Sequence, residues 1–275
     1  MQRKVHQSGL VGIIFVILIQ TPFSSVVARA NDTLSVNFCV PNADVYPFFI
    51  YQDATLTGTN PDIMKRVFQQ ETLSNVNLEF VPRPWKRCDI ELKAGTVDMI
   101  VGSYRESRDS VGIYPKEIGA PYDKAVFSTV EVCLTTLNNT AHIEKVRAGL
   151  NGEDKLTVGV EAGFSQQHKE NVVFEWLVLY NYLEKFRLLE KGRVDAIAQV
   201  CSIDNTPIKT KAEDAGLQNI ITLYPPYLSS EGYVIFSEQF MAQHADIAKT
   251  ILDELGRIDK QAIFQNYRPS QPSQE

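Results

Sequence analysis

An internal repeat constrains the fold of this chain more than any other feature of its sequence. The segments 92–100 (LKAGTVDMI) and 189–197 (LEKGRVDAI) share Leu, Gly, Val, Asp and Ile at an offset of 97 residues. In each copy a helical pattern ends at a glycine, which suits the left-handed position after a helix, and an apolar strand follows within three residues. The repeat predicts one helix-to-strand unit that is used twice, and therefore two matched lobes.

The rest of the sequence alternates between strand patterns and helix patterns. Apolar stretches of strand length occupy residues 34–40, 76–81, 97–101, 156–160, 172–178, 196–200 and 233–236. Helical spacing is found at Ile63 and Val67, at Trp85, Cys88 and Leu92, at Tyr182, Phe186 and Leu189, and at Ile247, Ile251, Leu255 and Ile258. This alternation predicts α/β lobes with largely parallel sheets.

Residues 1–30 have the pattern of a cleaved secretory signal peptide. Arg3 and Lys4 precede an apolar run over residues 10–19, and Ala28-Arg29-Ala30 follows it. The run is shorter than the roughly 20 apolar residues that a transmembrane helix needs. We therefore expect an exported, soluble protein whose remaining length exceeds that of one core of the commonest size.

The charge balance excludes two classes of partner. The sequence has 33 acidic and 27 basic residues, and three of the basic ones lie in the signal peptide. Surfaces that bind nucleic acid or anionic membranes need clustered Lys and Arg. We expect no nucleic-acid partner.

Four cysteines, Cys39, Cys88, Cys133 and Cys201, lie in the exported part of the chain. In an oxidising compartment they are expected to form disulfides, and three pairings are possible. Since no CxxC pair occurs and the four histidines lack ligand spacing, we expect neither a metal site nor a cofactor.

Several short motifs follow one another in a fixed order along the exported chain. They are Tyr46-Pro47-Phe48, Gly58 before Asp62-Ile63, the segment 85–98, Arg108 with Gly112-Ile113-Tyr114-Pro115, Pro121-Tyr122, Val158-Gly159-Val160 with Gly163 and Ser165, and the segment 192–196. In this order they resemble the amino-acid-binding type of bacterial periplasmic solute-binding proteins, family 3 of the extracellular solute-binding proteins, which are the receptors of ABC importers.

The resemblance implies an α/β fold of two Rossmann-like lobes joined by two hinge strands, with the ligand held in the cleft between the lobes. Lobe 1 is expected at residues 31–129 and 234–275 and lobe 2 at residues 130–233, with crossings near 126–132 and 230–236. It also implies a periplasmic monomer that binds a small molecule. Its partner is then the membrane permease of an ABC importer or a sensory receptor.

Within these lobes we expect the disulfides Cys39–Cys88 and Cys133–Cys201. In lobe 1, Cys39 ends the first strand and Cys88 lies on the helix that leads to the repeated strand. In lobe 2, Cys133 follows the first hinge strand and Cys201 ends the repeated strand. A bond between the lobes would obstruct hinge closure.

The segment after the strand 97–101 is the first candidate binding loop. Ligands of open α/β sheets bind beyond the carboxyl ends of the strands. Gly102 and Ser103 begin this segment, and Ser103 offers a hydroxyl and nearby backbone amides. Arg108 matches the family's carboxylate-binding arginine, and a guanidinium fork matches a carboxylate.

Two alternatives to this role of Arg108 stay open. The loop is about two residues shorter than in the family, so Arg105 competes for the role. Alternatively, Arg108 is a surface charge paired with Glu106 or Asp109.

Two aromatic residues and a second loop complete the candidate site. Trp85 and Tyr46 match positions where the family places aromatic residues along the cleft, although Trp85 also fits the core of its helix. In the second lobe, Glu161, Ser165 and Gln166 lie in a loop between a strand and a helix, where free amides receive anionic or carbonyl groups. Ser165 as a simple helix cap is the alternative.

The sequence departs from the family at the position of the acidic residue that usually neutralises the ammonium group of a bound amino acid. The acid that usually follows the second repeated strand is replaced by Val200. A buried ammonium without an acidic partner is costly. Either Glu161, Asp204 or Glu231 takes its place, with Glu161 favoured, or the ligand is not an ordinary α-amino acid.

The leading hypothesis is a receptor, not an enzyme, that closes on a small carboxylate-bearing ligand such as an amino acid or related organic acid, for import or sensing. The alternative is a periplasmic enzyme on the same scaffold, similar to cyclohexadienyl dehydratase. Its acid–base candidates are Glu161, Asp204 and His168, none of which shows a sequence pattern with a partner, so we expect no catalytic residue.

Overall fold

The computed structural model describes residues 33–104, 108–118, 125–162, 173–212 and 216–268. The predicted signal peptide, Arg105, Glu106, Ser165, Gln166 and His168 lie outside these residues. Within the described ranges, none of the helices is both long and apolar enough to span a membrane.

One mixed sheet carries most of the strands, in the order β4-β1-β5-β11-β6-β9-β7-β8, with β10 paired to β9. β1 is parallel to β4 and β5, and β7 is parallel to β8 and β9, as predicted. A separate hairpin is formed by β2 (Ile50–Gln52) and β3 (Thr55–Thr57). The strands of the main sheet are β1 (Leu34–Pro41), β4 (Val76–Arg83), β5 (Met99–Ser103), β6 (Val126–Leu137), β7 (Leu156–Glu161), β8 (Phe174–Leu179), β9 (Ala196–Ile203), β10 (Thr206–Pro207) and β11 (Ile220–Phe236).

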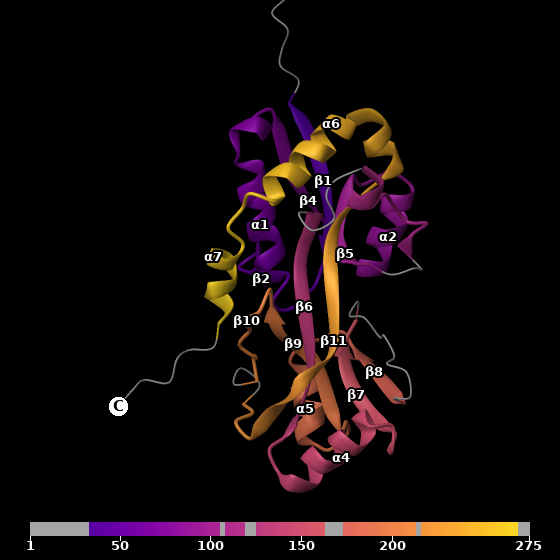
Figure 1. The fold of residues 1–275 in the computed structure, drawn as a ribbon, viewed down its shortest axis with the longest axis vertical. Helices are drawn as coiled ribbons and strands as arrows, with labels where there is room; N and C mark the ends of the chain where they lie inside the picture. Colours follow the sequence, from indigo (N-terminus) through magenta and orange to yellow (C-terminus); the bar gives the residue numbers. More distant parts are fainter. Residues whose placement is uncertain (1–32, 105–107, 119–124, 163–172, 213–215, 269–275) are drawn as a thin grey trace, which may run out of the picture. The chain divides into compact units, whose positions relative to one another are not determined.

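The two central strands connect the two halves of this sheet. β11 is antiparallel to both β5 and β6, and β6 is antiparallel to β9. Figure 1 shows β6 and β11 as long strands that run side by side through both halves. The fold is therefore the predicted α/β arrangement of two lobes joined by two strands. The sequence pattern had indicated only residues 233–236 of β11, which in fact begins at Ile220.

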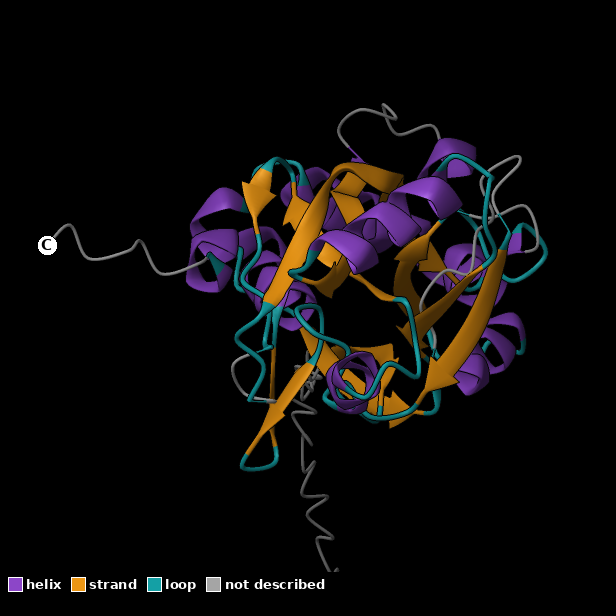
Figure 2. Ribbon diagram, turned by 90° about the horizontal axis from the view of Figure 1, so that it is seen from below, coloured by secondary structure: helices purple, strands orange, loops and turns teal. Residues whose placement is uncertain are grey.

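Helices flank the strands, as the view from below in Figure 2 shows. We call the half with β4, β1, β5, α1, α2 and α6 the first lobe, and the half with β9, β7, β8, α4 and α5 the second lobe. The helices are α1 (Thr59–Phe68), α2 (Trp85–Lys93), α4 (Thr140–Leu150), α5 (Glu184–Glu190), α6 (Glu238–Leu255) and α7 (Gln261–Phe264), with short 3₁₀ turns at Glu71–Leu73, Pro115–Ile118 and Gln265–Tyr267. α1 illustrates the amphipathic spacing, because it buries Ile63, Met64 and Val67.

The internal repeat has the same structure in both lobes. Gly95 and Gly192 follow α2 and α5 with φ of 68° and 62°, the left-handed conformation that glycine adopts without strain. The amide of each glycine donates to the carbonyl of the repeated leucine three residues before it, Leu92 or Leu189. Both leucine side chains are fully buried.

The repeated aspartates explain why this residue recurs. Asp98 Oδ2 accepts a hydrogen bond of 2.7 Å from the Asn37 amide in β1, and Asp195 Oδ2 accepts one of 2.9 Å from the Thr157 amide in β7. The amide of each aspartate donates back to the carbonyl of the same partner residue. Each aspartate thus ties the start of the repeated strand to the first strand of its lobe.

Both predicted disulfides are present. Cys39–Cys88 links β1 to α2, and Cys133–Cys201 links β6 to β9, each with a Cα–Cα distance of 5.6 Å. Neither bond joins the first-lobe strands and helices to those of the second lobe, so neither opposes a hinge motion.

Candidate functional site

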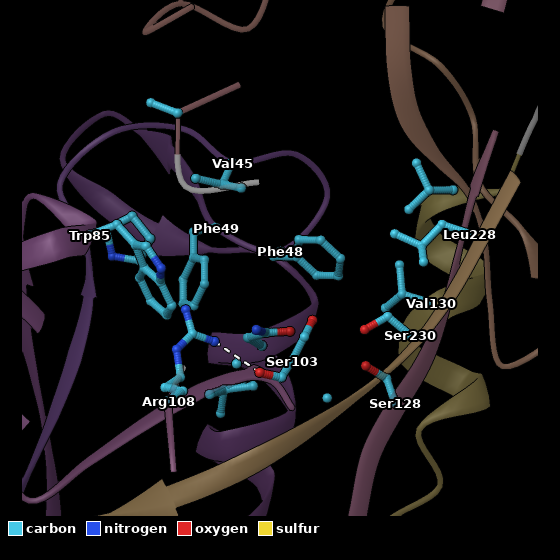
Figure 3. Close-up of a pocket in the computed structure, with 17 residues that line it drawn as sticks. Val45, Phe48, Phe49, Trp85, Ser103, Arg108, Ser128, Val130, Leu228 and Ser230 are labelled. Carbon is cyan, nitrogen blue, oxygen red and sulfur yellow. Dashed lines mark hydrogen bonds between the residues drawn. The ribbon is translucent and has the colours of Figure 1, made fainter. Parts of the chain in front are cut away.

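A pocket lies where the carboxyl ends of β1, β5 and β7 approach the central strands. Figure 3 shows Trp85, Phe49 and Arg108 on one side of it and the side chains of β6 and β11 on the other. Its lining consists of Pro41, Val45, Phe48, Phe49, Asn60, Trp85, Val101, Gly102, Ser103 and Arg108 from the first lobe, Ser128, Val130, Val132, Leu228, Ser230 and Gly232 from the central strands, and Ala162. Four of the predicted site residues, Trp85, Gly102, Ser103 and Arg108, therefore come together here.

Arg108 is a buried part of the pocket wall, not a surface charge. Its side chain is 5% exposed, and its Nε lies 3.3 Å from Asp89 Oδ1. Its Nη1 donates to the Ser103 carbonyl at 2.9 Å. Asp109, one partner of the surface alternative, instead accepts a hydrogen bond from Tyr104. One ion pair and one hydrogen bond therefore orient the guanidinium.

Trp85 and Gly102 form the part of the pocket wall against which the Arg108 guanidinium packs. Its Cζ lies 5.5 Å from the centre of the Trp85 ring, within the range of a cation–π contact. Trp85 is the first residue of α2 and follows Pro84, so the helix start places its ring at the pocket. A Cβ at Gly102 would come within 2.7 Å of Arg108 Nη1, so a side chain at this position would displace the guanidinium from its place.

Tyr46, predicted to line the cleft, is not one of the residues that line this pocket. Its ring packs against Tyr182 and Tyr267, with centroid distances of 5.4 and 6.3 Å, and Lys211 Nζ lies 4.9 Å above it. Tyr46 therefore lines a second pocket between its own loop and the segment 180–183. A β-bridge between Val45 and Phe49 closes the loop, and these two residues and Phe48 line the first pocket instead.

Glu161, the favoured partner of a ligand ammonium, is neutralised inside the second lobe. Its Oε1 lies 2.7 Å from Lys185 Nζ, and the two side chains are 6% and 1% exposed. Burial lowers the pKa of Lys185, and Glu161 opposes that shift. Glu161 is thus paired with Lys185 and is not one of the described residues that line the pocket. The next residue, Ala162, reaches the pocket.

The other acidic candidates have structural contacts away from the pocket. Asp204 forms the turn between β9 and β10 with φ of 45°, and its Oδ1 accepts from the Thr129 amide at 2.7 Å. Glu231 accepts from the Tyr233 hydroxyl. Val200 is 6% exposed and belongs to the large apolar cluster of the first lobe. Among the described lining residues, Arg108 is the one charged side chain.

Sequence reasoning missed the contribution of the central strands. Ser128, Val130 and Val132 alternate along β6, and Leu228, Ser230 and Gly232 alternate along β11. The period of two shows that each set shares one face, but it does not show which face meets a pocket. No group of His, Cys, Asp and Glu suited to a metal ion occurs within the described ranges.

No family model matches the sequence, and no curated protein matches it significantly. Solved structures do match. One, from work on glutathione import through GshT and the cystine ABC importer TcyBC of Streptococcus mutans, has a TM-score of 0.62 at 15% identity, over 86% of this chain and 98% of that one. An ancestral arginine-binding protein bound to arginine has a TM-score of 0.61 at 16% identity, over 84% and 95%.

A third structure is an ancestral amino-acid-binding protein described as a precursor of cyclohexadienyl dehydratase. It has a TM-score of 0.59 at 17% identity, over 84% of this chain and 92% of that one. These likenesses show that the chain has the fold of the two-lobed solute-binding proteins.

Proposed function

We propose that this protein is a periplasmic solute-binding protein, exported through a cleaved signal peptide, that captures a small carboxylate-bearing ligand between its lobes. It works as a monomer and presents the ligand-bound form to the permease of an ABC importer or to a sensory receptor. Lobe 1 comprises residues 31–129 and 234–275, and lobe 2 residues 130–233.

The buried guanidinium of Arg108 is the observation that carries this proposal. A planar guanidinium with a fixed orientation matches the geometry of a carboxylate, to which it can donate two parallel hydrogen bonds. Asp89 and the Ser103 carbonyl hold the cation in place before a ligand arrives. Such preorganisation reduces the entropy lost on binding.

Hinge closure follows from the position of the pocket on the connecting strands. β6 and β11 supply one wall, while loops of the first lobe and Ala162 of the second supply the others. A ligand that touches all of these walls binds the closed arrangement more strongly than the open one. It therefore shifts the population towards closure.

A thermal-shift screen of amino acids, organic acids and aromatic acids tests the proposal. A ligand at 100 times its dissociation constant adds about 2.7 kcal/mol to the free energy of unfolding. At least one carboxylate-bearing compound should raise the melting temperature in proportion to log concentration. The proposal is wrong if only compounds without a carboxylate do so.

We propose no catalytic activity. Two of the three acid–base candidates, Glu161 and Asp204, are engaged in structural contacts outside the pocket, and His168 lies outside the described residues. Because one matching structure is described as a dehydratase precursor, incubation with prephenate and arogenate is the appropriate check. We expect no aromatic product.

A further inference from the structure

The wall formed by the central strands has a polar end and an apolar end. β11 lies between β5 and β6, and Gly232 is in register with Ser103 on one side and with Ser128 on the other. All three residues line the pocket. They form one row across three strands, which we call the polar row.

Ser128 has hydrogen-bonding capacity that the protein itself does not use. The residue is 5% exposed and lines the pocket. Among the described residues, its hydroxyl has no hydrogen-bond partner. A serine hydroxyl at a pocket wall can donate one hydrogen bond to a ligand and can accept others.

Gly232 leaves space in the middle of the polar row. A Cβ added there would have the Ser128 carbonyl and hydroxyl as its nearest atoms, both at 3.6 Å, which is ordinary van der Waals contact. The position therefore has room for a methyl group that the chain leaves empty. Arg108 binds the Ser103 carbonyl at the end of this row, so its charge lies at the same end of the pocket.

The other end of the wall is apolar. On the pocket face of the ladder the next pairs are Val130 with Ser230, which is the polar side chain in this part of the wall, and then Val132 with Leu228. On its other side Val132 is paired with Val200, the residue that replaces the expected acid. An α-ammonium group is carried by the carbon next to the carboxylate, and none of the described residues that line the pocket is acidic, so its desolvation would not be compensated there.

We infer that the pocket takes an apolar monocarboxylate without an α-ammonium group. The carboxylate occupies the polar row beside Arg108, with Ser128 donating a hydrogen bond to it. The apolar body lies along Val130, Val132 and Leu228. This inference rests on the proposed function and specifies the class of ligand for the same site.

The test compares three compounds that share one carbon skeleton. Isocaproate is leucine without its amino group, and isocaproamide also lacks the negative charge. Hydrocinnamate, L-phenylalanine and hydrocinnamide form a second such set. In titration calorimetry with the full exported protein, the carboxylate of at least one set should bind at least tenfold more tightly than both its amino acid and its amide.

Two outcomes overturn the inference in different ways. If an amino acid binds more tightly than its deaminated analogue, the ligand class is wrong while the proposed carboxylate receptor stands. If the amide binds as tightly as the carboxylate, or if no carboxylate or amino acid of either set or of the wider screen binds, the proposed function fails as well.

Variants of the polar row locate the carboxylate. Gly232→Ala should weaken the best carboxylate at least tenfold because its methyl group fills the space, and Ser128→Ala should weaken it about fivefold. Ser229→Ala is the matched control, since Ser229 is exposed on the same strand and does not line the pocket. Circular dichroism and melting curves establish that each variant folds. Unchanged affinity in both folded variants would exclude the polar row as the carboxylate site.

Discussion

Arg108 combines burial, charge and a fixed orientation in one residue. Asp89 forms an ion pair with it, the Ser103 carbonyl accepts a hydrogen bond from it, and the Trp85 ring lies within cation–π distance. Truncating one partner of a buried charged pair usually costs about 2 to 5 kcal/mol of binding free energy. We expect Arg108→Ala to reduce ligand affinity by this amount, as measured by calorimetry.

Two further variants make this prediction specific to Arg108. Arg108→Lys should also bind weakly, because an ammonium lacks the planar fork of a guanidinium. Arg66→Ala removes an exposed arginine of the first lobe and should leave affinity unchanged. If Arg108→Ala binds normally, Arg105 becomes the candidate for the carboxylate.

Tyr267 gives a prediction about pH. Burial is the main cause that raises the pKa of its hydroxyl from 10.0 to about 12. Between these values the unfolded chain loses a proton that the folded protein keeps. The contribution of Tyr267 to stability is therefore complete below pH 10 and is lost as the pH rises towards 12.

Tyr267→Phe should accordingly show a smaller decrease in unfolding free energy between pH 10 and pH 12 than the unaltered protein. Urea denaturation at several pH values measures this difference. Tyr180→Phe is the control, because Tyr180 is 87% exposed. Equal pH slopes in the Tyr267→Phe variant and the unaltered protein would contradict the prediction.

At the scale of elements, the C-terminal helix α7 fastens the hairpin of β9 and β10 to the first lobe. Thr206 Oγ1 donates to Gln261 Oε1 at 2.5 Å, and Gln261 Nε2 donates to the Asp204 carbonyl at 2.9 Å. Ile203 and Ile208 of the hairpin pack in the same apolar cluster as Ile263 of α7. The hairpin is thus held by both side-chain hydrogen bonds and apolar contacts.

Loss of these hydrogen bonds should have a measurable cost. Each one contributes roughly 0.5 to 1.5 kcal/mol, so Gln261→Ala should lower the unfolding free energy by about 1 to 2 kcal/mol in urea denaturation. Gln243→Ala, at an exposed position of α6, should change it little. An unaltered midpoint for Gln261→Ala would show that the apolar contacts alone hold the hairpin.

For the whole molecule, the two connecting strands and the placement of the disulfides permit the lobes to move. Cys39–Cys88 and Cys133–Cys201 each lie on one side of the connection. Small-angle scattering should therefore show a smaller radius of gyration at saturating ligand than without ligand. The same decrease should be absent in Arg108→Ala at that ligand concentration. Tight binding with no change in radius would argue against hinge closure.

Several features of the fold were predictable from the sequence because they depend on local patterns. The repeated leucine, glycine and aspartate predicted two equivalent helix-to-strand units, and the structure has both, with matching hydrogen bonds around Asp98 and Asp195. Strand and helix periodicity likewise identified β1, β4, β7 and α2 within a few residues. The disulfide pairing could be predicted once the resemblance to the solute-binding family had indicated where each lobe begins and ends.

The site was only partly predictable because its residues depend on long-range pairing. Trp85 opens α2, Gly102 and Ser103 are the last two residues of β5, and Arg108 lies beyond that strand, which are positions that sequence can indicate. Tyr46 and Glu161 occupy similar positions, yet tertiary contacts with Tyr182 and Lys185 remove them from the pocket.

By itself, the sequence determined two α/β lobes, their repeated units and an arginine beyond a strand end, since these depend on neighbours along the chain. The tertiary structure alone decided that Ser128 and Gly232 of the central strands form the wall beside that arginine. It also decided that Lys185 neutralises the acid expected to meet an ammonium group. The physical reason is that strand register, burial and ion pairing depend on residues far apart in the chain, and these decide which side chains line the pocket.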